Sequence, residues 1–261
     1  MTRLDVLLVN KGIVKSRSNA SVEIKSGNVY VNGKKVCKPS YDVNLSDDIK
    51  LEGSSIKYVS RAGLKLEKAI NEFCIDLNGK VLLDIGSSTG GFTDCALQNN
   101  VREVIDVDVG SNQLNDKIRS DKKVHVFENT DIRTFNNELL KKVDIISIDV
   151  SFISVEKILN KISDIKSARE VICLIKPQFE CGKVVADKYK GVIKDKSVHI
   201  SVINNLINKF NSINYGLKGV TYSPIKGGSG NIEYLAYFVR DFNNSSVNAS
   251  SLVDSAFNRL S

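Results

Sequence analysis

The sequence predicts a doubly wound α/β fold with a mostly parallel sheet, preceded by a small α+β domain. Five near-continuous apolar runs separated by mostly helical patterns predict the sheet: 81–85, 104–108, 124–127, 143–149 and 171–175. This composition is typical of parallel strands whose two faces are both covered by helices. The first 52 residues differ, because two short helical patterns precede brief alternating runs. A chain of 261 residues accommodates both parts.

The small domain begins with two expected helices. Spaced leucines predict the first helix within residues 2–12, and Gly12 is its stop signal. Ser16 or Ser18 can cap the second, which ends near Gly27.

A small sheet is expected to follow. Asn32-Gly33 predicts a tight hairpin after Val29–Val31, and Ile49–Leu51 forms a further strand. The expected domain therefore spans residues 1–52.

The larger domain follows an expected linker, 53–58, and is expected to span residues 59–242. Its amphipathic helices are expected at 62–74, 154–166 and 195–210, and a late strand at 235–239. Residues 243–261 are rich in Asn and Ser and are expected to form a polar tail with a short helix at 252–260.

The positive charge of the chain is concentrated near its start. The formal net charge is +7, and residues 1–38 hold eight Lys or Arg against Asp5 and Glu23. A local basic face suits nucleic acid or an anionic membrane surface, and a solvated lysine-rich surface is the alternative.

Cysteine and histidine usage argues against a disulfide framework and a metal site. The five cysteines include no CxxC pair, and the two histidines lack metal-ligand spacing. The start of the chain holds no signal-peptide core, and no apolar run approaches the roughly 20 residues that span a bilayer. We therefore expect a cytoplasmic protein that is not inserted in a membrane and holds no metal.

The first chemical motif is a glycine-rich turn that follows an acid at the end of a strand. Glycine allows a ligand to approach the backbone, and an acid suits a cationic amino group. The pattern is not that of a dinucleotide site. It favours S-adenosylmethionine, with candidate contacts Asp84, Gly86, Ser87, Thr89, Gly90, Gly91 and Phe92.

An acid at the end of the next strand is the candidate for the hydroxyls of a ribose. Asp108 lies nearest the strand end, and Asp106 competes because it shares a face with it. Asp131, after the third strand, is the weaker candidate for an adenine contact.

Four further residues are weak candidates when each is taken alone. Asp149 and Lys176 follow the fourth and fifth strands. Lys65 lies one turn into the helix expected at 62–74, and Glu233 precedes the late strand. The segment after Asp149 lacks the Pro-Pro-aromatic pattern of enzymes that methylate amino groups. Cys173 lies inside an apolar strand and is expected to be inert.

These motifs in combination resemble the TlyA family, within the FtsJ-like ribose methyltransferases. The segments that carry the resemblance are 60–65, 84–94, 108–114, 149–154, 176–180 and 230–235. Residues 1–52 resemble the RNA-binding domain first seen in ribosomal protein S4, through Arg3-Leu4-Asp5, Ser16-Arg17 and Val29 to Gly33.

The resemblance implies a class I (Rossmann-like) methyltransferase sheet, S-adenosylmethionine as cofactor and methylation of ribose 2′-hydroxyls, of cytidine, in ribosomal RNA. The family's Lys–Asp–Lys–Glu tetrad falls on Lys65, Asp149, Lys176 and Glu233. Lys176 is expected nearest the 2′-oxygen, either to remove its proton or to orient it. The expected RNA contacts are Arg3, Lys15, Arg17, Lys25, Lys34 and Lys35.

Ribosomal RNA or ribosomal subunits are therefore the expected partners. Three alternatives compete with this interpretation. An assembly factor without catalysis would keep the RNA-binding domain but not need the tetrad. A membrane-active, haemolysin-like protein would need a spanning or strongly basic amphipathic helix, and a base methyltransferase would need a different motif after Asp149.

Overall fold

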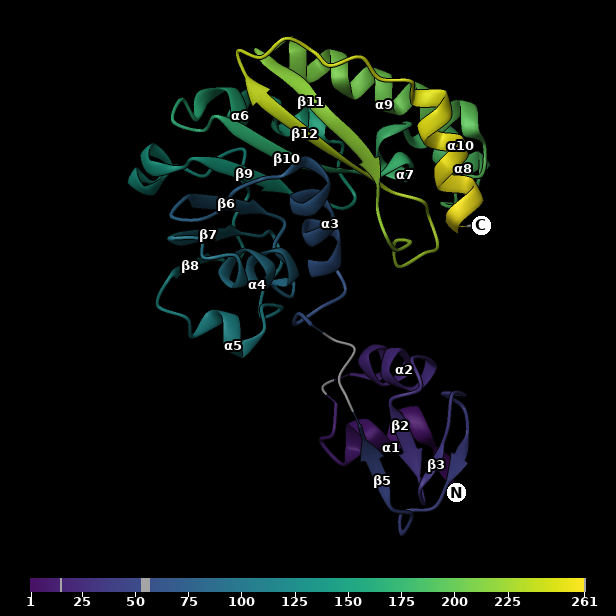
Figure 1. Ribbon diagram of the computed structural model, residues 1–261. Coiled ribbons are helices and arrows are strands. Elements are labelled where there is room, and N and C mark those ends of the chain that lie inside the picture. Colours follow the sequence, from purple (N-terminus) through teal and green to yellow (C-terminus); the bar gives the residue numbers. More distant parts are fainter. Residues whose placement is uncertain (15, 53–56, 261) are drawn as a thin grey trace. The chain divides into compact units, whose positions relative to one another are not determined.

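The computed structural model describes residues 1–14, 16–52 and 57–260. The chain divides into two compact units, Met1–Lys57 and Tyr58–Ser261 (Figure 1). Residues 53–56 of the expected linker lie outside the described residues. Tyr58, which was assigned to that linker, is buried against the core of the second unit.

The first unit has two helices and two small sheets. Its elements are β1 (Thr2–Arg3), α1 (Leu4–Asn10), α2 (Arg17–Lys25), β2 (Val29–Val31), β3 (Lys34–Lys35), β4 (Asp42–Val43) and β5 (Ile49–Leu51). One sheet has the order β3-β2-β5, and β1 pairs with β4. The leucines of α1 pack with Ala20 and Ile24 of α2 and with Val29 of β2, and this unit therefore has a core of its own.

Local signals in the first unit were interpreted correctly. Ser16 is the N-cap of α2 and accepts a hydrogen bond from the Asn19 amide. Asn32 and Gly33 both have positive φ, 51° and 76°. A two-residue turn of this kind matches the twist of a hairpin, and β2 pairs antiparallel with β3 across it.

The second unit is built around a seven-stranded sheet. Its strands are β6 (Val81–Ile85), β7 (Glu103–Val107), β8 (Val124–Phe127), β9 (Ile145–Ile148), β10 (Glu170–Ile175), β11 (Tyr215–Tyr222) and β12 (Tyr234–Arg240). The order is β11-β12-β10-β9-β6-β7-β8. Strand β12 runs antiparallel to β11 and to β10, and the other described strand pairs of this sheet are parallel. The doubly wound sheet that the apolar runs predicted is confirmed.

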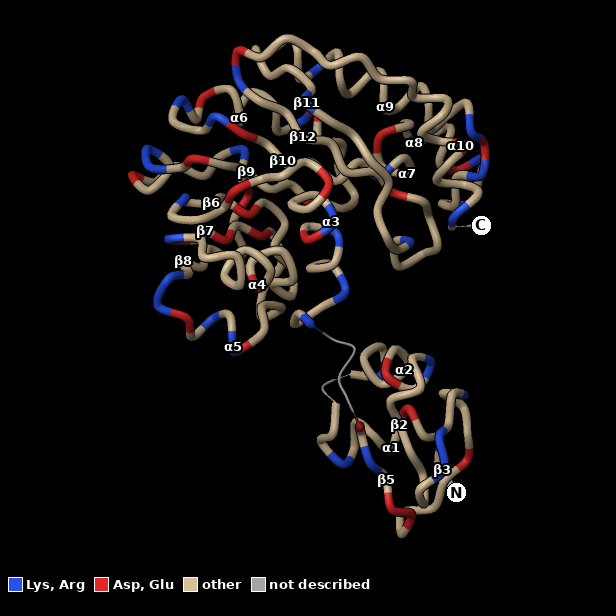
Figure 2. Tube along the Cα trace, viewed as in Figure 1, with Lys and Arg blue, Asp and Glu red and all other residues tan. Residues whose placement is uncertain are grey.

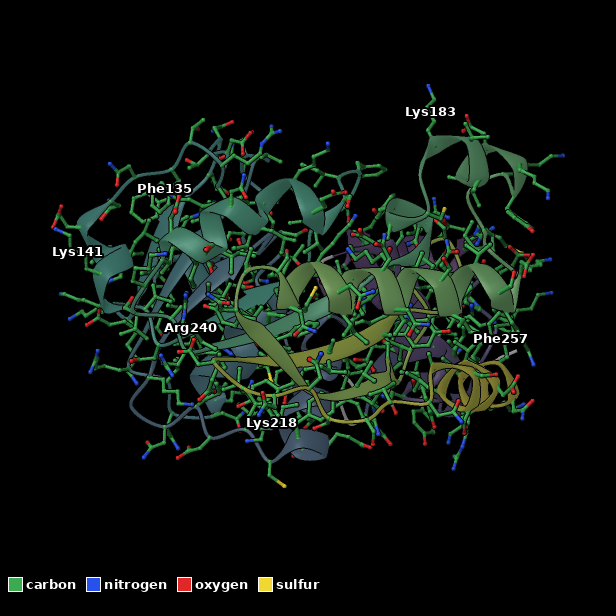
Figure 3. The ribbon with its side chains drawn as sticks, turned by 90° about the horizontal axis from the view of Figure 1, so that it is seen from above. Phe135, Lys141, Lys183, Lys218, Arg240 and Phe257 are labelled. Atoms are coloured by element: carbon green, nitrogen blue, oxygen red, sulfur yellow. The ribbon has the colours of Figure 1, made fainter. Side chains whose placement is uncertain are left out.

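Helices cover both faces of this sheet. They are α3 (Gly63–Phe73), α4 (Gly91–Gln98), α5 (Asp116–Arg119), α6 (Leu159–Asp164), α7 (Pro177–Glu180), α8 (Lys183–Lys188), α9 (Lys196–Asn211) and α10 (Ala249–Leu260), with short 3-10 helices at Glu138–Lys142 and Val155–Ile158. Successive strand residues point to opposite faces, and Leu82 and Leu83 therefore belong to different core clusters. The cluster of Leu82 includes residues of α3, α4 and α5, and that of Leu83 includes residues of α6, α9 and α10. Figure 3 shows α9 alongside the strands β11 and β12, and α10 contacts α9 and β11.

Three elements differ from the sequence prediction. The helix expected at 154–166 is a 3-10 turn followed by the shorter α6. The segment expected as a polar tail contains α10, whose Val253 and Ala256 are fully buried in a core cluster that also includes residues of α9. Strand β11 was not predicted, because its Gly216, Lys218 and Gly219 interrupt the apolar pattern.

Candidate active site

The sheet topology brings five chemically important segments to one edge. Parallel strands β6, β7, β9 and β10 all end at this edge, and antiparallel β12 begins there. Ile175 of β10 pairs with Tyr234 of β12. Lys176 and Glu233, 57 positions apart in the sequence, therefore follow and precede one pair of neighbouring residues.

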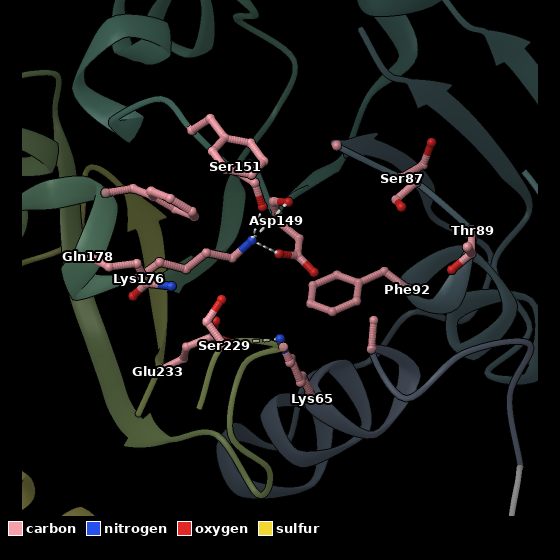
Figure 4. Close-up of a pocket in the computed structure, with 16 residues that line it drawn as sticks. Lys65, Ser87, Thr89, Phe92, Asp149, Ser151, Lys176, Gln178, Ser229 and Glu233 are labelled. Atoms are coloured by element: carbon pink, nitrogen blue, oxygen red, sulfur yellow. Dashed lines mark hydrogen bonds and ion pairs between the residues drawn. The ribbon is translucent and has the colours of Figure 1, made fainter. Parts of the chain in front are cut away.

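The four expected catalytic residues form two ion pairs that face one cavity, one of them buried and the other largely buried. Lys65 Nζ lies 2.6 Å from Glu233 Oε2, and their side chains are 9% and 3% exposed. Lys176 Nζ lies 2.6 Å from Asp149 Oδ1, with exposures of 9% and 15%. Figure 4 shows both pairs converging from separate elements. Two positive and two negative charges thus compensate each other, as buried charges require.

Lys176 has two further hydrogen-bond acceptors. Its ammonium donates to Ser151 Oγ at 2.8 Å and to the Asp149 carbonyl at 3.4 Å. An ammonium has three protons, and the one directed to the carbonyl makes the longest bond. That proton is the easiest to redirect to an incoming hydroxyl oxygen.

The cavity around these pairs has a volume of about 310 Å³. It is lined by Lys65, Asp149, Lys176 and Glu233, and also by the expected cofactor residues Gly86, Ser87, Thr89 and Phe92. Sequence reasoning missed Ser151, Gln178 and Ser229, which also line this cavity (Figure 4). Their nearness to Lys176 and Glu233 in sequence was the signal that could have identified them.

A second cavity of about 470 Å³ continues from the first. The two share the lining residues Gly86, Ser88, Asp149, Ser151 and Phe152. The second is lined also by two expected cofactor residues, Asp108 and Asp131. Together the cavities form an elongated site along the ends of β6, β7 and β9.

Gly86 lines both cavities, and a residue with a side chain does not fit at this position. It has φ of 84°, and a Cβ built there would lie 2.8 Å from the Asp149 carbonyl oxygen. The close approach of these two backbone segments brings the end of β6 and the end of β9 together under the site. Gly90, with φ of 85°, is the N-cap of α4 and turns the chain into that helix.

Asp108 and Asp131 are held in fixed orientations. Asp108 accepts hydrogen bonds from the amides of Ser88 (2.8 Å) and Gly110 (2.6 Å). Asp131 is paired with the Arg133 guanidinium, which lowers the pKa of that carboxyl. Asp108 therefore suits a neutral diol, and its rival Asp106 does not line either cavity.

Three expected cofactor residues do not line the cavities: Asp84, Gly90 and Gly91. Asp84 is fully buried, and its two oxygens accept hydrogen bonds from Ser147 and Thr93. Burial raises the pKa of Asp84 to about 6. Each of its oxygens thus has one partner inside the protein, and a direct contact of Asp84 with a cationic group stays a prediction.

The expected RNA contacts of the first unit lie at its surface. Arg3 and Arg17 both bind the buried carboxylate of Asp5, while their guanidinium-bearing side chains are 49% and 61% exposed. Lys25, Lys34 and Lys35 are exposed, and Figure 2 marks these basic positions along α2 and β3. Lys15 lies outside the described residues.

Other reactive groups are not part of the site. Cys173 is fully buried inside β10, and burial raises the pKa of its thiol. Within residues 1–14, 16–52 and 57–260 there is no cluster of three or more metal-ligating side chains. No helix over the same residues is long and apolar enough to cross a membrane.

The fold and the site define an S-adenosylmethionine-type methyltransferase architecture, and comparison with known proteins gives the class. Residues 58–240 match the model of FtsJ-like methyltransferases, and residues 2–49 match that of the S4 domain. The fold is similar to that of a solved protein from Pyrococcus horikoshii, with a TM-score of 0.50 and 18% identity over 73% of this chain and 88% of that protein.

The chain belongs to the TlyA family of FtsJ-like methyltransferases. It is 38% identical to the 23S rRNA (cytidine-2'-O)-methyltransferase TlyA of Campylobacter jejuni, over 89% of this chain and 98% of that protein. It is 43% identical to Hemolysin A of Brachyspira hyodysenteriae, over 91% and 99% of the two chains. A solved structure from Streptococcus thermophilus, also named a hemolysin, has a TM-score of 0.77 and 35% identity over 98% and 96%.

Proposed function

We propose that this protein transfers a methyl group from S-adenosylmethionine to the 2′-hydroxyl of a cytidine ribose in ribosomal RNA. The observation that carries this proposal is the convergence of the Lys65–Glu233 and Lys176–Asp149 pairs on one cavity beside Gly86. The names of the TlyA relatives supply the substrate class.

The two connected cavities fit the proposed cofactor. Asp108, oriented by two backbone amides, suits ribose hydroxyls, and Asp131 lies further along the second cavity. The glycine turn leaves room beside Ser87 and Thr89 in the first cavity. When bound, S-adenosylmethionine supplies an electrophilic methyl group on a sulfonium sulfur.

The protein's own task is then to align and activate the hydroxyl oxygen. Lys176 donates a hydrogen bond to the 2′-oxygen with the proton now directed to the Asp149 carbonyl. The hydroxyl proton, released as the oxygen–methyl bond forms, passes to the Asp149 carboxylate, which lines the same cavity. Asp149 and Ser151 hold the ammonium in place. Holding the oxygen in line with the methyl carbon contributes most of the acceleration, because direct displacement requires alignment. The Lys65–Glu233 pair fixes the opposite wall.

The rim of the first cavity suits an unpaired nucleotide. Phe152 is 92% exposed and its ring lies 5.1 Å from that of Phe179, a distance typical of aromatic packing. Exposed aromatic rings provide stacking surfaces for bases that have left a helix. Gln178 Oε1 is buried without a hydrogen-bond partner among the residues described and can accept one from a base.

The partner is ribosomal RNA or a ribosomal subunit, recognised through the first unit. Arg3 and Arg17 provide two adjacent guanidiniums for phosphate, and Lys25, Lys34 and Lys35 extend the basic surface. Such contacts position the enzyme on RNA, while the second unit performs the transfer. An enzyme that modifies ribosomal RNA acts where ribosomes assemble. We therefore propose a cytoplasmic location.

Methyl transfer from labelled S-adenosylmethionine to ribosomal RNA and ribosomal subunits tests this function. Wild type should label a discrete ribose, and Lys176→Ala should lose at least about a hundredfold in rate while cofactor affinity stays within about twofold. Lys141→Ala changes an exposed lysine that precedes β9, at the edge of the sheet opposite to the cavity, and this matched control should remain active. Cofactor binding without transfer to any RNA would instead favour an assembly factor.

A further inference from the structure

A buried polar row lies behind the glycine turn and is not explained by direct ligand contact. Asp106, Asp84 and Ser147 are cross-strand neighbours on β7, β6 and β9. Thr93 of α4 joins the row: its Oγ1 lies 2.8 Å from Asp84 Oδ2 and 2.6 Å from Asp106 Oδ1. Ser147 Oγ lies 2.7 Å from Asp84 Oδ1. The exposure of all four residues is at most 1%.

The hydrogen atoms in this row do not suffice if both carboxyls are ionised. Three contacts of hydrogen-bond length connect Thr93, Asp84, Asp106 and Ser147. Each hydroxyl has one proton, and an ionised carboxylate has none to donate. Two hydroxyl protons can make only two of the three bonds. The third proton must therefore come from a carboxyl. Otherwise charged oxygens of Asp84 and Asp106 would both face the Thr93 hydroxyl, which has a single proton for the two of them.

The distribution of partners places that proton on Asp106. Asp84 has a hydrogen-bond partner on each oxygen, and such bonds favour the charged form of a carboxyl. Asp106 has a partner on Oδ1 alone, and its Oδ2 is buried with none among the described residues. A buried carboxylate oxygen without a partner is costly, whereas the carbonyl oxygen of a neutral acid is much less so.

The surrounding charges act in the same direction. The charged groups that face the pair are acids: Asp149 and Asp108 near Asp84, and Asp108 and Glu128 near Asp106. No ion pair joins either carboxyl to a Lys or Arg of the described residues. Burial, and then the neighbouring Asp84, raise the pKa of Asp106 well above its usual value.

We propose that Asp106 is a positioning residue of the cofactor site, held as a neutral acid that donates its proton to Thr93. Thr93 in turn donates to ionised Asp84, and Ser147 completes the chain. Short segments of chain link the buried row to the candidate cofactor site. Asp84 lies two residues before Gly86, Asp106 lies two before Asp108, and Thr93 lies three after Gly90. The chain of hydrogen bonds therefore fixes the glycine turn and the acid that faces the cofactor relative to one another.

The pH dependence has a definite sign. The neutral form of Asp106 makes the chain of bonds, and its pKa is raised in the folded protein. The bond that the Asp106 proton makes to Thr93 is therefore fully present below the unfolded pKa of Asp106 and is lost as the pH rises through the folded pKa. Asp106→Asn keeps an N–H donor for Thr93 and cannot titrate, and Asp106→Leu removes the donor at similar volume.

The protonation state is tested on the cofactor-free protein by infrared difference spectroscopy. The spectrum of wild type minus Asp106→Asn at neutral pH should contain the C=O stretching band of a protonated carboxyl, and that band should disappear at alkaline pH. Only carboxylate bands in this difference would overturn the proposal. This readout does not depend on the proposed methyltransferase function.

The positioning role, which rests on the proposed use of S-adenosylmethionine, is tested by calorimetric binding as a function of pH. At neutral pH Asp106→Asn should bind within about twofold of wild type, and Asp106→Leu about tenfold more weakly, the equivalent of one buried hydrogen bond. Wild type should lose affinity at alkaline pH relative to Asp106→Asn. Both proteins bind the same cofactor, so titration of the cofactor itself affects both affinities equally. Equal profiles for the two proteins, or a tenfold loss in Asp106→Asn at neutral pH, would contradict the proposal. Denaturant unfolding of each variant separates misfolding from either result.

Discussion

Each lysine of the candidate active site depends on a carboxylate that comes from a distant part of the chain. Lys65 and Glu233 are 168 residues apart, and Lys176 and Asp149 are 27 apart. Buried charges of this kind are tolerated only as pairs, because removing one partner leaves the other desolvated and uncompensated. The pairs therefore connect stability to the geometry of the site.

Glu233→Gln should reduce both stability and methyl transfer. The change leaves the Lys65 ammonium buried without its counter-charge, and we expect the free energy of unfolding to fall by about 3 kcal/mol. Denaturant unfolding and the methyl-transfer assay measure the two effects. Glu138→Gln removes the partner of exposed Lys141 and should change neither. The double variant Lys65→Met/Glu233→Leu should recover stability but not activity; equal losses in both variants would exclude a buried-charge explanation.

Asp5→Asn should weaken RNA binding although it removes a negative charge. Asp5 holds the guanidiniums of Arg3 and Arg17 side by side, and these bonds lower the pKa of Asp5 to about 2. Without the carboxylate both side chains regain rotational freedom, and we expect affinity for ribosomal RNA to fall roughly threefold to tenfold. Filter binding or calorimetry at fixed salt measures it.

The matched control for this change is Asp48→Asn. Asp48 lies in the same unit with its side chain 64% exposed and is not bound to either arginine. If overall charge alone governs binding, both variants should bind RNA more tightly than wild type. A gain in Asp5→Asn would thus contradict the positioning of the two arginines.

At the scale of elements, the turn from β6 to α4 and the start of β12 do most to build the site. The turn contacts the end of β9 through Gly86, and β12 brings Glu233 to the edge because it runs antiparallel. A parallel seventh strand would have placed its first residue at the opposite edge of the sheet. Strand direction, rather than residue type, therefore decides whether Glu233 can meet Lys65.

Gly86→Ala should abolish cofactor binding, and Gly79→Ala should not. Both positions have positive φ, 84° and 72°, so each variant should lose about 1 kcal/mol of stability from backbone strain. Only at Gly86 does the new Cβ meet a backbone oxygen, whereas at Gly79 nothing lies within 4 Å. Calorimetry with S-adenosylmethionine and denaturant unfolding distinguish the two. Unchanged affinity in Gly86→Ala would show that the close approach to Asp149 does not shape the cavity.

At the scale of the whole molecule, the chain consists of two units with separate cores. One core cluster contains only residues of the first unit, and two clusters contain only residues of the second. Apolar burial is the main stabilisation of each unit, so neither core depends on the other. This separation agrees with the proposal that the first unit recognises RNA and the second transfers the methyl group.

A fragment of residues 58–261 should therefore fold and bind S-adenosylmethionine like the intact protein. We expect its cofactor affinity to stay within about twofold and its affinity for ribosomal RNA to fall at least about tenfold, because the arginines and lysines of the first unit are lost. Circular dichroism, calorimetry and filter binding measure the three properties. Undiminished RNA affinity would place the main RNA contacts in the second unit.

The sequence by itself determined the local structure and the identity of the most important residues. Apolar runs indicated six of the seven strands, Ser16 and Asn32-Gly33 indicated a helix cap and a hairpin, and family motifs indicated the tetrad. These signals are visible because burial on both faces, capping and positive φ each require particular residue types at fixed spacing. Strand β11 and the burial of α10 were missed, since their composition is mixed and their contacts are tertiary.

Only the tertiary structure decided which acids face the cavity and which are internal. Asp84, Asp106 and Asp108 look alike in sequence, at or near the ends of two apolar runs. The structure places Asp108 on the second cavity, and it buries Asp84 and Asp106 around Thr93. The reason is physical: the same carboxyl is a ligand contact or a structural acid according to the donors that fold around it, and those donors come from α4 and β9.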